Sequence, residues 1–119
     1  MKATKLLVFA FCLFLFANAS TSYAQIIKTS LTITVRDDLG NTVEAASVKL
    51  FENEADYLAE KNIAYEGVTD NKGVVKFKKM KSIPYYVLAS KGDKNNAGGG
   101  EITGKLEPNV YNKVTIVIN

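Results

Sequence analysis

The sequence predicts an all-β protein: a seven-stranded β-sandwich with Greek-key-like connections and one short helix or helical loop near residues 53–61. Short segments in which β-branched and aromatic residues alternate with polar ones recur along the chain, as in strands with one buried face. Clusters of Asp, Asn and Gly separate these segments at close intervals, which is typical of a sandwich. Residues 25–119, which follow an N-terminal leader, are enough for a single small domain.

The first expected strand, residues 29–36, shows the pattern most clearly, because Leu31, Ile33 and Val35 alternate with polar residues. The other strands are expected at residues 46–50, in a segment ending at 69, and at 75–77, 85–90, 102–106 and 114–118. The predicted core consists of Val48, Leu50, Val75, Phe77, Leu88 and Ile116. Tyr86 is expected to point into the core and Tyr85 away from it, because neighbours in a strand face opposite sides.

A short helix is expected to connect two of these strands. Asn53 is a good N-cap residue, and Asp56 stands at the reciprocal position of a capping box. Acidic residues in the first turn favour the positive end of the helix dipole, and Lys61 favours the opposite end. The helix or helical loop is therefore expected within residues 53–61.

Residues 1–24 have the layout of a secretory signal peptide. Lys2 and Lys5 precede twelve apolar residues, Leu6–Ala17, and a short polar segment follows that ends in Ser22-Tyr23-Ala24. Cleavage there makes Gln25 the expected N-terminus; residues 17–19 offer a second small-x-small signal. A permanent membrane anchor is the alternative, but twelve helical residues span only about 18 Å of a ~30 Å hydrocarbon core.

Composition argues against most enzyme chemistry. The whole chain has a net charge of +3, but two of its 15 basic residues lie in the leader, which leaves 13 basic against 12 acidic residues. This balance gives no support to nucleic-acid binding. The chain has no His, and its single Cys12 lies inside the leader. The usual general base, thiol nucleophile and zinc ligands are therefore missing from residues 25–119, and neither catalytic activity nor a cofactor is expected.

Three spaced motifs are more specific than the strand pattern. They are Val35-x-Asp37-x-x-Gly40-x-x-Val43-x-x-Ala46-x-Val48-x-Leu50, Thr69-Asp70-x-x-Gly73-x-x-x-Phe77 and Tyr86-x-Leu88-x-Ser90-Lys91-Gly92. Together they resemble the signatures of carboxypeptidase regulatory-like domains, which are prealbumin-like β-sandwiches. The resemblance covers roughly residues 30–92 and implies the fold rather than an activity. Free-standing domains of this kind imply an accessory protein that docks on a larger envelope partner.

The chain also departs from this family. Thr42 replaces a common proline, Ala45 a common glycine, and Asp93 an aromatic residue that often follows Gly92. Transthyretin-like hydroxyisourate hydrolases share the fold but need histidines, so their activity is not carried over. The Lys–Asn crosslink of similar adhesin modules is not expected either, because the position of the amine nucleophile falls on Arg36 or Val35 and that of the assisting acid falls on Ser90.

Two turns offer candidate calcium ligands. Residues 37–41 and 70–73 carry oxygen-bearing side chains on turns that we expect at the same end of the sandwich: Asp37, Asp38, Asn41, Asp70 and Asn71. Ca²⁺ binds six to eight oxygen ligands, but the same residue types also form turns without a metal. No EF-hand spacing is present. We therefore expect turn chemistry here, with calcium as the alternative.

Three surface features are candidates for binding. Lys72, Lys76, Lys78, Lys79 and Lys81 form a basic run that suits either a solvated strand face or a polyanion. Tyr85, with Tyr57, Tyr65 or Tyr111, would form an aromatic platform for a sugar. The glycine-rich loop 92–100 is expected to become ordered only through contacts with a partner. Replacing Asn95 and Asn96 with alanine is therefore expected to weaken the binding of that partner without changing the stability of the protein.

These observations predict an exported, non-catalytic β-sandwich module with a structural or protein-interaction role in the cell envelope, either periplasmic or at the cell surface. The alternative is a small carbohydrate- or polyanion-binding module. A protein partner is expected, with no nucleic acid and no membrane span once the leader is removed. An unpaired edge strand would favour binding by strand addition, whereas tyrosines gathered on one exposed face would favour a sugar.

Overall fold

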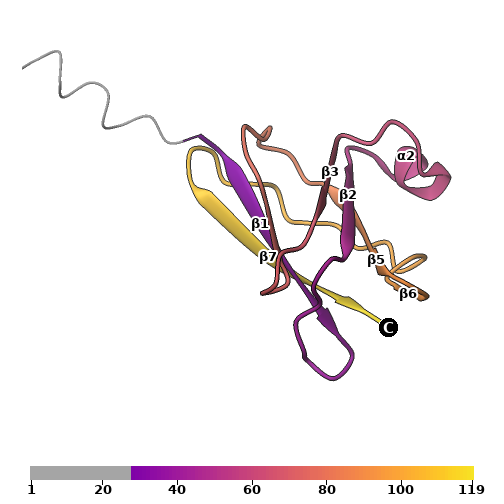
Figure 1. The fold of residues 1–119 in the computed structure, drawn as a ribbon. Coiled ribbons are helices and arrows are strands. Elements are labelled where there is room, and N and C mark those ends of the chain that lie inside the picture. Colours follow the sequence, from indigo (N-terminus) through magenta and orange to yellow (C-terminus); the bar gives the residue numbers. More distant parts are fainter. Residues whose placement is uncertain (1–27) are drawn as a thin grey trace, which may run out of the picture.

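The computed structural model describes residues 28–119, which form two packed β-sheets and one short helix (Figure 1). The predicted leader and the expected N-terminus at Gln25 lie outside the described residues. The first sheet has the order β4-β1-β7 and contains Val74–Phe77, Ser30–Asp37 and Tyr111–Ile118. The second has the order β3-β2-β5-β6 and contains Tyr65–Val68, Ser47–Phe51, Tyr86–Lys91 and Lys94–Asn95. The seven-stranded β-sandwich predicted from the sequence is confirmed.

The first sheet joins the two ends of the described chain. β1 pairs with β4 in antiparallel register, with Leu31 opposite Phe77, and with β7 in parallel register over eight residue pairs, from Ser30↔Tyr111 to Asp37↔Ile118. Two parallel strands cannot be joined by a tight turn and need a long connection. Here that connection contains β4 and the whole of the second sheet, which lie between β1 and β7 in the sequence. β7 is thereby left at one edge of the sandwich.

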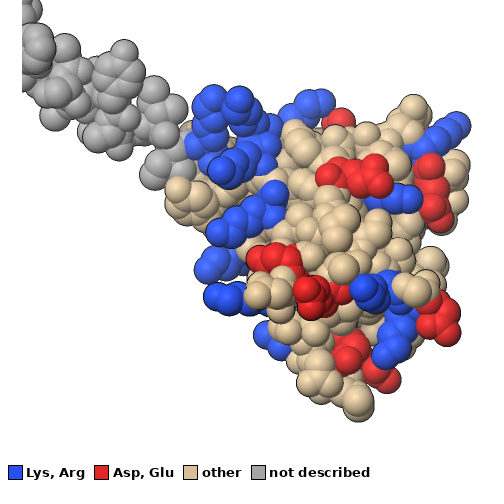
Figure 2. All heavy atoms as spheres, in the orientation of Figure 1, with Lys and Arg blue, Asp and Glu red and all other residues tan. Residues whose placement is uncertain are grey.

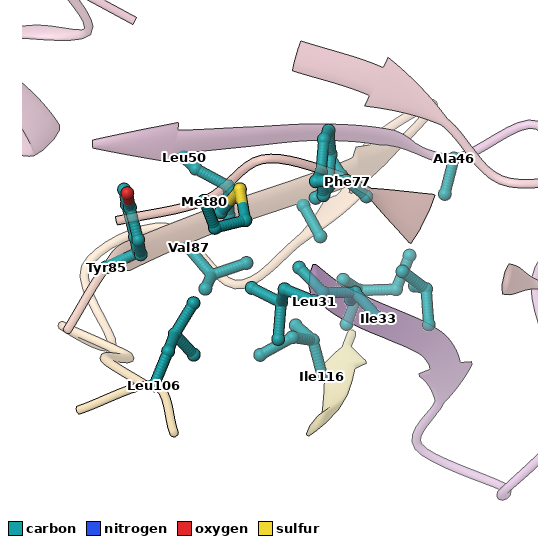
Figure 3. Close-up of a cluster of buried hydrophobic side chains, with 14 residues drawn as sticks. Leu31, Ile33, Ala46, Leu50, Phe77, Met80, Tyr85, Val87, Leu106 and Ile116 are labelled. Atoms are coloured by element: carbon teal, nitrogen blue, oxygen red, sulfur yellow. The ribbon is translucent and has the colours of Figure 1, made fainter. Parts of the chain in front are cut away.

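The core lies between the sheets, where inward residues of β1 and β7 face those of β2 and β5 (Figure 3). Leu31, Ile33 and Val35 are completely buried, as their alternation predicts. Val48, Leu50, Phe77 and Ile116 are also buried, which confirms four of the six predicted core residues. Val75 is partly buried against this cluster.

The predicted face of β5 is wrong. Val87 and Ala89 are buried and Leu88 is only half-buried, and the fully buried tyrosine is Tyr85 rather than Tyr86. The strand is apolar on both sides, so alternation alone could not distinguish its faces. Tyr86 instead packs under the helix, with its ring centroid 5.6 Å from that of Tyr57.

Helix α2, Glu54–Ala59, confirms the predicted short helix and its Asn53 N-cap, while the reciprocal bond of the capping box joins the two side chains rather than the Asn53 backbone. The backbone N–H of Asp56 donates to Asn53 Oδ1 at 2.8 Å, and Asn53 Nδ2 donates to Asp56 Oδ2 at 3.0 Å. Tyr57 is the buried residue of the helix and contacts Phe51 edge-on at a centroid distance of 5.9 Å. The helix thus covers the outer face of β2 and β5 near Phe51.

The prediction of a strand at residues 102–106 is also wrong. Only an isolated bridge forms there, between Tyr86 and Ile102. The hydroxyl of Thr103 accepts the backbone N–H of Tyr85 at 3.0 Å, so a side chain takes the place of a backbone acceptor and the ladder does not continue. The sixth strand is instead Lys94–Asn95, inside the segment predicted to be a loop.

Ala45 has a left-handed backbone conformation, with φ of 57°. This is the position where the resembling family commonly has glycine, and an L side chain costs about 1–2 kcal/mol in that conformation. We expect Ala45→Gly to raise the free energy of unfolding by about 1 kcal/mol in urea titrations. Ala55→Gly, inside α2, is the matched control and should lower it by about 1 kcal/mol. Destabilisation by both changes would contradict the backbone assignment.

Candidate interaction surface

The two aspartate turns have the same geometry. Asp37 Oδ1 accepts the backbone N–H groups of Leu39 and Asn41 at 3.0 and 2.9 Å, and Asp70 Oδ1 accepts those of Lys72 and Val74 at 2.8 and 3.0 Å. In each turn the glycine three residues on, Gly40 or Gly73, has positive φ. The repeated Asp-x-x-Gly motif thus builds one type of turn twice.

These hydrogen bonds also stabilise the ionised form of the two turn carboxylates. The N–H of Asn41 lowers the pKa of Asp37, and the N–H of Val74, together with that of Lys72, lowers the pKa of Asp70. One oxygen of each carboxylate is therefore already used by its own turn. Within residues 28–119, no three acidic side chains gather closely enough to hold a metal ion. Asp37 and Asp70 thus have the turn-forming role that the sequence predicts for them.

The glycine-rich segment 92–100 is ordered by its own contacts, contrary to the sequence-based expectation. β6 pairs with β5 through Ser90↔Asn95 and Lys91↔Lys94. Asn96 is buried, with its Oδ1 accepting the N–H of Ala89 at 2.8 Å and its Nδ2 donating to Val87 O at 2.9 Å. Asn96 therefore bonds the segment to the backbone of β5. Replacing Asn95 and Asn96 would lower the stability of the protein, so this change cannot serve as a test of partner binding alone.

The proposed tyrosine platform does not form. Tyr57 and Tyr85 are buried, and Tyr65 packs edge-on against Tyr85 at a centroid distance of 5.9 Å. Burial raises the pKa of the Tyr85 hydroxyl, which accepts the N–H of Lys81 at 3.2 Å. Tyr111 is 73% exposed and lies apart from the other three, at the start of β7 in the first sheet. The tyrosines mainly fill the interior, so the sugar platform predicted from them is wrong.

The predicted lysine run divides into two groups. Lys72 lies in the turn before β4, and Lys81 forms an ion pair with Glu52 at 3.0 Å. Lys76, Lys78 and Lys79 instead line an open groove together with residues of β1 and β7. The sequence alone does not place Tyr111 and Lys113 of β7 beside these lysines, because they lie more than thirty positions away along the chain.

The outer edge of β7 is the other feature that can bind a partner. The N–H of Ser30 donates to Val110 O at 3.2 Å, so the carbonyl of Val110 faces β1. Asn119 exchanges both of its backbone hydrogen bonds with Asn95, at 3.2 and 3.3 Å, on the side away from β1. Because strand groups alternate in direction, the odd-numbered residues of β7 direct their backbone N–H and C=O groups away from the sheet.

Four consecutive outward positions are therefore available on this edge: Tyr111, Lys113, Thr115 and Val117. Within residues 28–119, β7 pairs only with β1, and no further backbone or side-chain group bonds the main chain at these four positions. β7 is eight residues long, whereas β4 at the opposite edge has four. Long unpaired edges are the sites at which sheets accept another strand.

Comparisons with solved structures find proteins that contain a similar fold. A variant of the major pilin subunit of Bacillus cereus is 22% identical, with a TM-score of 0.52, and the match covers 78% of this chain and 30% of that chain. The Bacillus anthracis TIE protein is 20% identical, with a TM-score of 0.54, and the match covers 77% of this chain and 17% of that one. The chain thus spans less than a third of the length of either protein. At these identities, the likeness shows the β-sandwich fold alone.

No protein-family model matches the chain, and no curated protein matches it either. Within the described part of the chain, no helix has the length and apolarity needed to span a membrane.

Proposed function

We propose that the chain is an exported, non-catalytic β-sandwich module that binds a protein partner in the cell envelope or at the cell surface. In this proposal residues 1–24 are the signal peptide and residues 25–119 are the mature domain. The partner adds an extended segment to the outer edge of β7. Binding by strand addition uses main-chain hydrogen bonds for affinity and the flanking side chains for specificity.

The open edge of β7 is the observation that supports this proposal most. Its four outward residues present backbone donors and acceptors at alternate positions over a strand of eight residues. Tyr111 and Val117 are exposed apolar side chains at the two ends of this row. A partner strand placed here would pair the free groups and cover both apolar residues.

Composition and fold support the non-catalytic part of the proposal. The chain has no His, and its single Cys lies at position 12, outside the proposed mature domain. The pilin subunit with a similar fold supports a structural or interaction role at the surface, as does the resemblance to carboxypeptidase regulatory-like domains.

Replacing Thr115 with proline tests the proposal. Thr115→Pro removes an outward N–H and places a ring on the free edge, where proline is tolerated in native sheets. In a pull-down from an envelope extract, we expect this variant to lose the proteins that the unmodified protein retains. Its thermal unfolding should remain cooperative, which shows that the domain is still folded. Thr115→Ala keeps the N–H and is the matched control, so it should retain the same proteins. Should Thr115→Pro fail to fold, Lys113→Pro applies the same test two residues away.

The two variants separate the possible results. Loss of the same proteins in Thr115→Pro and retention in Thr115→Ala supports strand addition at β7. Equal retention by both variants would contradict it. Detection of the chain only in the cytoplasm, with Met1 still present by intact-mass analysis, would contradict the proposed export.

A further inference from the structure

A basic groove lies on the outer face of the β4-β1-β7 sheet. It has a volume of about 950 Å³ and is lined by Lys28, Ser30, Thr32, Lys76, Lys78, Lys79, Tyr111 and Lys113. Figure 2 shows Lys and Arg side chains gathering along the side of the molecule where β1 and β7 begin in Figure 1. Five of its eight lining residues are lysines, contributed by three separate segments of the chain.

Strand pairing positions these lysines. Thr32 of β1 lies opposite Lys76 on β4 and opposite Lys113 on β7, so the two lysines flank it on the outer face. Two residues nearer the start of β1, Ser30 lies opposite Tyr111. Because β1 and β7 are parallel, Lys113 of the C-terminal strand lies at the same end of the sheet as Lys76 and the lysines that follow β4.

The groove has almost no compensating negative charge. The three strands contain a single acidic residue, Asp37, which lies at the opposite end of β1 and accepts hydrogen bonds from its own turn. The two ion pairs of the described residues involve Lys49 and Lys81, neither of which lines the groove. Five neighbouring cations without acidic partners favour an anionic ligand.

The uncharged lining residues indicate which kind of anion fits. Thr32 provides a partly exposed hydroxyl, and Tyr111 provides an exposed aromatic ring. Ser30 is only 8% exposed and its Oγ is buried, so it shapes the floor of the groove. An aromatic ring and a hydroxyl beside lysines suit a polar, hydroxylated polymer that carries negative charges.

Two other classes of anionic partner fit less well. The groove has no aliphatic lining residue, whereas the centre of a protein interface is apolar and depleted in Lys. An anionic membrane presents a flat surface, which a concave groove contacts poorly. We propose that this groove binds an anionic polysaccharide, whose carboxylate or sulfate groups contact the lysines while a sugar ring lies against Tyr111.

The test uses heparin and polygalacturonate as sulfated and carboxylated probes for the purified protein. We expect binding to at least one of them at low salt, with an affinity that falls steeply as salt is added. Lys76→Gln/Lys78→Gln should weaken that binding about tenfold and reduce the salt slope by about two, one for each lysine removed. Both changes lie away from the β7 edge, so they leave the proposed strand addition untouched.

A charge-matched control separates the effect of the groove lysines from the effect of net charge alone. Lys61→Gln/Lys91→Gln deletes the same charge at two exposed positions outside the groove and should change the affinity less than twofold. Equal weakening by the two double variants would overturn the proposal, as would the absence of binding to both probes. Equally tight, Lys76- and Lys78-dependent binding to poly-L-glutamate or to phosphatidylglycerol vesicles would also overturn it, in favour of an acidic protein or a membrane.

Discussion

Phe77→Ala is expected to lower the free energy of unfolding by about 3–5 kcal/mol, the usual cost of truncating a buried phenylalanine. Phe77 is 6% exposed and belongs to the core cluster between the two sheets. Its ring meets that of Tyr65 edge-on at a centroid distance of 6.0 Å, so truncation also removes a contact between β4 and β3. Urea denaturation followed by circular dichroism measures the loss.

A neighbouring position controls for effects of the strand itself. Lys76→Ala lies one residue away on the outer face of β4 and should change stability by less than about 0.5 kcal/mol. If Phe77→Ala leaves the protein unfolded, Phe77→Leu still measures the position, with a smaller expected loss. A loss below about 1 kcal/mol for Phe77→Ala would mean that the inward face of β4 is assigned incorrectly.

Asn96→Ala is expected to lower the free energy of unfolding by about 2–4 kcal/mol. The side chain is 7% exposed and makes hydrogen bonds to the backbone of Ala89 and Val87. Its removal leaves a donor and an acceptor of β5 buried without partners, which costs more than the lost bonds alone.

The adjacent asparagine is the control for this experiment. Asn95 Oδ1 accepts only the nearby N–H of Ala97, in an exposed turn, so Asn95→Ala should cost about 0.5 kcal/mol. Chemical denaturation of the two single variants compares them directly. Equal losses of unfolding free energy in the two variants would contradict the role assigned to Asn96. They would instead support a loop that becomes ordered only when a partner binds.

Local features of the fold followed from the sequence, and long-range features did not. Asp37 and Asp70 each precede a glycine by three residues, and Asn53 precedes Asp56 by three, so neighbouring residues alone determine the turns and the helix cap. The outward face of β5 depends on the covering helix, and the role of Asn96 depends on a strand seven residues away. Neither property appears in the local pattern.

The candidate site was predicted only in part for the same reason. The sequence predicts a basic strand face at Lys76 and Lys78, but Lys113 and Tyr111 join them only because β7 lies parallel to β1. The pairing brings together residues about 80 positions apart, such as Ser30 and Tyr111. Strand order likewise decides which strand is left at an edge, and alternation of apolar residues carries no information about it.

Native-state amide hydrogen exchange along β7 tests the central claim most directly. If the outer edge is open, the amides of Asn112, Val114 and Ile116, which face β1, should be protected, while those of Lys113, Thr115 and Val117 exchange rapidly. Adding an envelope partner should then slow exchange at the second set. Uniform protection of all six amides in the isolated protein would show that the edge is already covered and would contradict the account.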